Sequence, residues 1–110
     1  MKQGDIFLVK FHPSVGKELR KMRPAMIVQC RVTKKSDLIT VMPLSTKVAQ
    51  MAKTNVLIPK DQKNKLTEDS VVMTDHIMTF DRSRFLNRIG ETSSPVLRRV
   101  RGALRRHFLL

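Results

Sequence analysis

The chain has 110 residues, of which 22 are lysine or arginine and 9 are aspartate or glutamate, so its formal net charge is +13. At this length we expect one domain over residues 1–110, able to bury roughly two-thirds of the surface that the unfolded chain exposes. The charge predicts a polyanionic partner, nucleic acid first and an acidic protein as the alternative, and it disfavours a membrane surface because the basic residues are not gathered beside an apolar anchor.

Cysteine usage and the N-terminal residues indicate the compartment. Cys30 is the only cysteine, so a disulfide within the chain is excluded, and the default expectation is a small buried residue on a strand. The chain runs into a predicted strand without an apolar signal segment, and no stretch has the apolar length that spans a bilayer. We therefore expect a cytoplasmic protein with no membrane partner.

Short stretches of β-favouring residues alternate with turn signals over the first three quarters of the chain. The predicted strands cover residues 5–11, 25–32, 38–42, 55–58 and 70–74. The second is apolar at nearly every position until Gln29, so it is predicted to be central and covered on both faces. Pro43 is expected to end the third strand, and residues 60–65 form a loop. This pattern predicts a small antiparallel barrel.

The last quarter of the chain has helical periodicity. Ser94 and Pro95 supply an N-cap and a first-turn proline. One helical face carries the apolar residues Val96, Leu97, Val100, Ala103, Leu104 and Phe108, and the other face carries Arg98, Arg99, Arg101, Arg105 and Arg106. The apolar stripe is predicted to pack against the barrel. For the arginines, a solvated surface, a nucleic-acid contact and a site for an acidic partner remain open.

A basic segment at residues 16–24 is the leading candidate for a functional site. It contains one carboxylate, Glu18, and four cations: Lys17, Arg20, Lys21 and Arg23. An arginine directly before a proline is biased toward extended backbone, so Arg23 is predicted at the mouth of the second strand, where it suits a phosphate ligand. The alternative interpretation is a solvated surface hairpin.

The chain lacks the usual patterns for metal and nucleotide chemistry. The three histidines, His12, His76 and His107, have no metal-ligand spacing, and no glycine-rich phosphate loop is present. The carboxylate pair Glu68 and Asp69 resembles a turn signal more than a two-metal site. No metal or cofactor is expected. RNA offers a metal-free reaction, because its 2′-hydroxyl is an internal nucleophile that needs a base, a protonated leaving group and stabilised phosphorane charge.

Several short motifs follow one another in a fixed order over nearly the whole chain. They are Gly4-Asp5-Ile6, the segment 11–18, Arg23-Pro24, the segment 41–46, Ser70-Val71-Val72, Asp75-His76-Ile77, the segment 79–84 and Ile89-Gly90. Each motif is weak alone, but the ordered set at this length is specific. It resembles the MazF/PemK (Kid-like) toxins of bacterial toxin–antitoxin systems, which are metal-independent RNA-cleaving enzymes.

The resemblance implies an SH3-like barrel with appended helices, a homodimer whose interface grooves hold single-stranded RNA or mRNA, and a cognate acidic antitoxin that blocks the groove. The residues that it assigns to catalysis are Arg23, Ser45, Thr46, Glu18, Asp75 and His76. The expected RNA-binding residues are Lys17, Arg20, Lys21, His12 and Lys47.

This chain departs from the family pattern at two places. The hydroxyl position is Ser45 followed by Thr46 rather than threonine followed by serine, so either can carry the role. The family's frequent Asp-Gln is Asp75-His76 here; a turn cap is the alternative role for Asp75, and a structural role is the alternative for His76.

We therefore expect a sequence-selective, single-strand endoribonuclease toxin that leaves 2′,3′-cyclic phosphate and 5′-hydroxyl ends. The alternatives are a CcdB-like DNA gyrase poison and a non-catalytic RNA-binding barrel, and the Arg-Pro and Pro-Leu-Ser motifs favour the enzyme.

Overall fold

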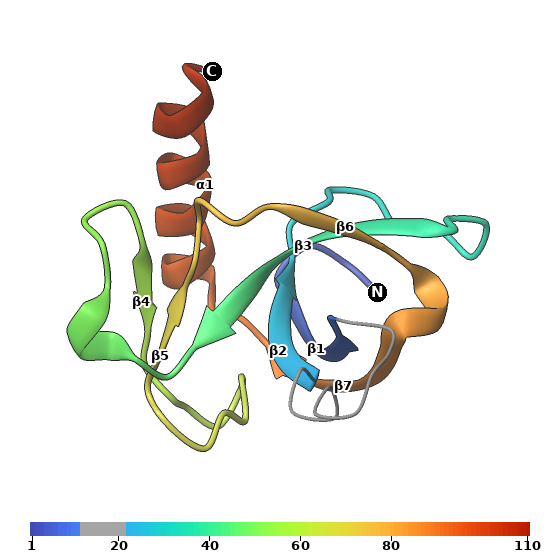
Figure 1. Ribbon diagram of the computed structural model, residues 1–110, viewed down its shortest axis with the longest axis horizontal. Coiled ribbons are helices and arrows are strands. Elements are labelled where there is room, and N and C mark those ends of the chain that lie inside the picture. Colours follow the sequence, from blue (N-terminus) through green and yellow to red (C-terminus); the bar gives the residue numbers. More distant parts are fainter. Residues whose placement is uncertain (12–21) are drawn as a thin grey trace.

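The computed structural model describes residues 1–11 and 22–110, and these form an antiparallel sheet with a C-terminal helix (Figure 1). The strands run in the order β4-β5-β3-β2-β1-β7, and β6 also pairs with β3. Their bounds are β1 Asp5–Lys10, β2 Met22–Ile27, β3 Leu38–Ser45, β4 Val56–Ile58, β5 Ser70–Val72, β6 Met78–Asp81 and β7 Phe85–Glu91. Helix α1 spans Ser94–Phe108, and short 3-10 turns lie at Val48–Gln50 and Arg82–Arg84.

The sheet has an apolar cluster on each face, because successive side chains of a strand point to opposite sides. In β2, Ala25 and Ile27 join one cluster with Val9, Ile39 and Val41. Met26 joins the other cluster, to which α1 contributes Val96, Val100 and Ala103. The three β2 side chains are fully buried, which confirms that the second strand is central and covered on both faces. It begins and ends earlier than predicted, at Met22–Ile27 rather than 25–32.

The third strand does not end at Pro43, as expected, but continues to Ser45. Proline has no N–H to donate to a sheet ladder. At this point Met73 donates its N–H to the Pro43 carbonyl (3.0 Å), and the Met73 carbonyl accepts from the N–H of His76 (3.0 Å) instead of from Pro43. The strand therefore tolerates the proline. The Met73 carbonyl, which cannot accept a hydrogen bond from Pro43, instead closes the turn that carries Asp75 and His76.

Residues 78–91 contain two strands that were not predicted, β6 and β7. Most side chains of these two strands are exposed or half-buried, and their sequences do not show the alternation of apolar and polar residues that indicates a strand. Pairing with distant strands holds them in place: β6 lies antiparallel to the beginning of β3, and β7 to β1. Cys30, expected to be buried on a strand, is exposed and follows β2.

The C-terminal helix begins as predicted near Pro95, but its N-cap is Ser93 rather than Ser94. Val96, Val100 and Ala103 are buried against the sheet, so the predicted packing of the apolar stripe is confirmed for its first three turns. Phe108 is 52% exposed, because the end of α1 projects beyond the sheet (Figure 1). Among the described residues, no helix is both long and apolar enough to cross a membrane.

A small ionic cluster joins the N-terminus to β7. The carboxylate of Asp5 is almost fully buried and accepts hydrogen bonds from the Lys2 backbone N–H (3.0 Å), Lys2 Nζ (2.8 Å) and Arg88 (3.3 Å). Burial by itself raises the pKa of Asp5, but these donors outweigh it and leave the pKa below its ordinary value. Asp5 is therefore ionised at neutral pH, and the cluster aligns β1 with β7.

Gly90 on β7 lies directly against the loop that precedes β5. A Cβ at this position would stand 2.4 Å from the Asn64 carbonyl oxygen and 2.7 Å from that of Lys63. Asn64 itself is buried, and its side chain donates to the Pro59 carbonyl and accepts from the Asp61 and Leu66 N–H groups. This loop backbone is held from several sides and has little freedom to move away.

We therefore expect Gly90→Ala to lower the free energy of unfolding by about 1–3 kcal/mol, the usual cost of overpacking a well-packed site. Gly102→Ala is the comparison: a Cβ there meets only the Arg106 guanidinium at 3.5 Å, so this variant should be as stable as the wild type or more stable, because alanine has the higher helix propensity. Urea unfolding followed by circular dichroism measures both variants. Equal stability of the Gly90 variant and the wild type would contradict the close approach.

Candidate active site

A groove of about 400 Å3 opens where β3 leaves β2. The pairing of β2 with β3 ends at Ala25 opposite Pro43, and the next residues of β3 pair with β5 instead. One wall of the groove is Arg23 and Pro24, and the other is formed by the end of β3 and the residues after it. The full lining is Arg23, Pro24, Leu44, Ser45, Thr46, Lys47 and Met73.

Arg23 is the second residue of β2, opposite Val9 of β1, so its predicted position at the mouth of a strand is confirmed. Its side chain is exposed, and no described residue accepts a hydrogen bond from the guanidinium. Because the backbone is fixed by the β1 ladder, the guanidinium extends from a rigid base. Its planar set of donors is suited to two oxygens of one phosphate.

Ser45 and Thr46 both line the groove, but they are held differently. The Ser45 hydroxyl oxygen accepts the backbone N–H of Lys47 at 3.1 Å, which orients the hydroxyl and leaves its hydrogen free for donation. The Thr46 side chain is exposed, and only its carbonyl is engaged, by the N–H of Val48 at 2.9 Å. The geometry therefore favours Ser45 as the oriented donor. Lys47 adds a second positive charge to the lining.

Asp75 and His76 lie on the turn between β5 and β6 and are not part of this lining. One oxygen of the Asp75 carboxylate is hydrogen-bonded to His76 Nδ1 (2.9 Å) and accepts from the Asn55 amide (3.2 Å). The hydrogen bond from His76 is the main cause that holds the pKa of Asp75 below its ordinary value. Both side chains are about half exposed. Through the hydrogen bond from Asn55, the pair ties the turn to the residue before β4.

Four of the eleven predicted site residues line the groove: Arg23, Ser45, Thr46 and Lys47. Five others, His12, Lys17, Glu18, Arg20 and Lys21, lie outside the described residues. The sequence analysis missed the apolar part of the lining, Pro24, Leu44 and Met73, although the first two are the partners of Arg23 and Ser45 in the Arg-Pro and Pro-Leu-Ser motifs. In residues 1–11 and 22–110, no three His, Cys, Asp or Glu side chains are grouped as a metal site.

The groove places an arginine, a lysine and two hydroxyl groups together on a small antiparallel sheet, and these groups define a phosphate-binding protein. Comparison of the sequence with known families shows which phosphate-binding protein this is. Residues 2–108 match the model of the family of PemK-like, MazF-like toxins of type II toxin–antitoxin systems, and the chain belongs to this family. The predicted family is thus confirmed.

Individual relatives agree with this assignment. The chain is 30% identical to the endoribonuclease MazF of Staphylococcus saprophyticus, over 94% of this chain and 88% of that protein. It is 27% identical to the endoribonuclease EndoA of Bacillus subtilis, over 94% and 90%. The fold is similar to that of MazF from Deinococcus radiodurans, with a TM-score of 0.79, 26% identity and coverage of 100% and 97%, which confirms the predicted fold class.

Proposed function

We propose that this chain is the endoribonuclease toxin of a toxin–antitoxin system and that it cleaves single-stranded RNA in the groove between β2 and the end of β3. Its family consists of type II toxins, and the curated relatives that it matches over nearly their whole length are named endoribonucleases. The observation that carries the location is the groove itself. It brings Arg23 of β2 together with Ser45 at the end of β3, and with Thr46 and Lys47 directly after it, on one surface.

The proposed reaction uses the substrate's own 2′-hydroxyl as the nucleophile, without a metal ion. A base removes the 2′-proton, the 2′-oxygen bonds to the adjacent phosphorus, and the bond from phosphorus to the 5′-oxygen breaks. Negative charge accumulates on the non-bridging oxygens during attack. Arg23 binds these oxygens, and Ser45 donates its free hydrogen to one of them. The products are a 2′,3′-cyclic phosphate and, once the leaving oxygen has taken a proton, a 5′-hydroxyl.

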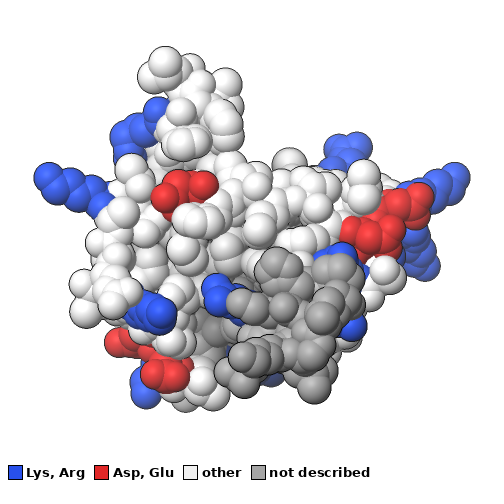
Figure 2. Space-filling model, viewed as in Figure 1, with Lys and Arg blue, Asp and Glu red and all other residues white. Residues whose placement is uncertain are grey.

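Charge supports a polyanionic substrate and an acidic neutralising partner. Lysine and arginine side chains are scattered over the face shown in Figure 2, at its edges and near its middle, whereas acidic side chains form small separate groups. A strand of RNA gains affinity by releasing counterions to such a surface. We also propose that a second copy of the chain completes the groove. A cognate acidic antitoxin blocks this groove and is steered toward it by the positive electrostatic field of the chain.

Ser45→Ala should slow cleavage by about 10²-fold, because removing one oriented donor to a developing oxyanion costs 10²–10³ in rate. Thr46→Ala should change the rate by only a few-fold, since no described backbone donor orients its hydroxyl. Single-turnover cleavage of a labelled RNA, with circular dichroism as the control for folding, compares the two variants. The reverse order would assign the role to Thr46.

The function is tested by incubating the purified chain with RNA in EDTA and identifying the new ends. We expect cleavage that persists in EDTA and yields cyclic phosphate and 5′-hydroxyl termini at a restricted set of sequences. Bound but uncut RNA would favour the non-catalytic RNA-binding barrel. Neither binding nor cleavage, together with inhibition of DNA gyrase, would favour the CcdB-like gyrase poison.

A further inference from the structure

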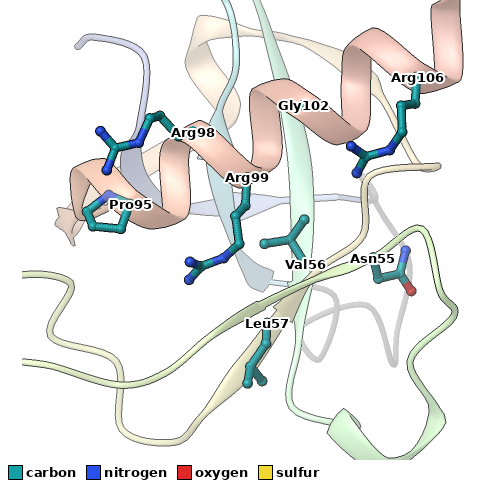
Figure 3. A pocket seen from close by; sticks show the side chains of 8 residues that line it. All are labelled: Asn55, Val56, Leu57, Pro95, Arg98, Arg99, Gly102 and Arg106. Carbon is teal, nitrogen blue, oxygen red and sulfur yellow. The ribbon is translucent and has the colours of Figure 1, made fainter.

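The arginines of this protein are used in two ways. On helix α1, Arg98, Arg99 and Arg106 line a hollow of about 560 Å3 between the helix and β4 (Figure 3), and no described residue accepts a hydrogen bond from them. Arg84 is used differently. It lies at the end of the 3-10 turn between β6 and β7, is half-buried, and donates to two backbone carbonyls at the end of β1. An arginine of this kind acts on the backbone that it holds.

The Arg84 guanidinium fixes the last residues of β1. Its Nη1 donates to the carbonyl oxygens of Lys10 (3.2 Å) and Phe11 (2.9 Å). Its central carbon lies 5.5 Å from the centre of the Phe80 ring, and the same ring packs against Phe11, with 5.0 Å between the ring centres. Hydrogen bonds from a charged donor and a cation over an aromatic ring both favour this arrangement. We call the three side chains of Arg84, Phe80 and Phe11 the β1 clamp.

The β1 clamp takes over where strand pairing stops on one side of β1. β7 pairs with β1 only as far as Val9, which is opposite Phe85, whereas β2 pairs with β1 as far as Lys10, opposite Met22. Beyond Val9, the next residue on the β7 side is Arg84, and its side chain supplies the donor for the carbonyls. The end pairs of a ladder open most easily, because few contacts hold them. The clamp opposes this opening.

Arg23 lies within the part of the sheet that the β1 clamp holds. It is opposite Val9, one pair before the last described pair of β1 and β2. Because opposite residues of a ladder share a face and side chains alternate, Arg23 lies on the same face as Val9 and Phe11. The strand end held by Arg84 is therefore the base from which the phosphate-binding guanidinium extends. A displacement of about 1 Å in such a group can cost about 10² in rate.

We propose that Arg84 is a positioning residue for RNA cleavage. Through the β1 clamp it keeps the end of β1, and with it Arg23, in the geometry that the transition state requires, and it acts through the backbone rather than on the substrate. Loss of the clamp should therefore lower kcat more than it raises KM, because the groups that bind RNA are still present but are misaligned during the reaction. This inference rests on the proposed cleavage of RNA, whereas the clamp itself is testable without RNA.

The first test compares Arg84→Gln with a matched control, Arg82→Gln. Arg82 lies on the same turn and also donates to two backbone carbonyls, those of Ser36 (2.8 Å) and Thr33 (2.5 Å), but these lie in the loop between β2 and β3. Each variant thus removes one charge and two carbonyl contacts. We expect Arg84→Gln to lower kcat about tenfold or more with less than about a threefold change in KM, and Arg82→Gln to stay within about twofold of the wild type in both.

Rescue by lysine separates positioning from phosphate binding. Arg84→Lys should restore most of kcat, because both carbonyls accept from the single nitrogen Nη1 and an ammonium group can replace it. At Arg23, by contrast, lysine is expected to recover little. Wild-type kcat in Arg84→Gln, an equal loss in Arg82→Gln, or no rescue by lysine would overturn the proposal. A weaker salt dependence of RNA binding in Arg84→Gln would also overturn it, since Arg84 would then be a phosphate contact.

Amide hydrogen exchange, followed by NMR, tests the β1 clamp in the full chain without RNA. In Arg84→Gln, the amides in residues 8–10 and 22–25 should exchange about tenfold faster than in the wild type, while those of the β3–β5 pair keep their rates. Unchanged exchange at the end of β1 would overturn the clamp. If the wild-type chain does not cleave RNA, the proposed function fails, whereas faster exchange in the variant still supports the clamp, so the two failures are distinguishable.

Discussion

Replacing Arg23 with alanine should nearly abolish RNA cleavage and leave the fold intact. The guanidinium extends from a rigid strand into the groove and is the group best placed to bind two oxygens of a phosphate that gains charge. Removing one such preorganised donor commonly costs about 10²–10³ in rate. The exposed side chain takes no part in the two apolar clusters, so the stability should change little. Single-turnover cleavage and urea unfolding measure the two effects separately.

Arg23→Lys is the informative companion, because lysine keeps the charge but lacks the planar pair of donors. We expect it to recover little of the lost rate. Substantial recovery would mean that the groove needs only a positive charge. Lys47→Gln is a useful control in the same lining, since it removes one charge and leaves Arg23 in place. Wild-type cleavage by the Arg23→Ala variant would remove this residue from the mechanism.

The second large effect on cleavage is expected from a change in the RNA substrate. Replacing the nucleotide before the scissile bond with its 2′-deoxy form should stop cleavage at that bond, because the proposed nucleophile is then absent. Binding should be retained, since the phosphates that Arg23 and Lys47 are proposed to contact are unchanged. A matched RNA with the deoxy nucleotide one position away controls for local conformation. Cleavage of the deoxy substrate at a comparable rate, or loss of cleavage of the all-RNA substrate in EDTA, would contradict the metal-free 2′-hydroxyl mechanism.

Several features of this protein followed from local sequence. The α1 helix was predictable because its apolar positions and first-turn proline are encoded within one stretch, although the exposure of its end at Phe108 was not. Arg23 was placed at a strand mouth by its neighbour Pro24, whose ring restricts the preceding backbone. Ser45 was found through the resemblance of its Pro-Leu-Ser motif to the motif of the toxin family. For the helix and for Arg23, the governing interaction lies within a few residues.

Other features were decided by contacts between distant segments. β6 and β7 have no clear alternating pattern, and only pairing with β3 and β1 makes them strands, which reflects how strongly strand preference depends on neighbours. Judged from its neighbours alone, Pro43 is expected to end a strand. Its missing N–H is tolerated because β3 stops pairing with β2 at this residue and pairs with β5 from the next one. The separation of β3 from β2 opens the candidate active site. The hollow between α1 and β4 likewise exists only once the helix has packed on the sheet. The sequence by itself determined the family, the helix and the groups that can bind phosphate. Only the tertiary structure decided which of those groups share a groove, because that depends on where paired strands separate.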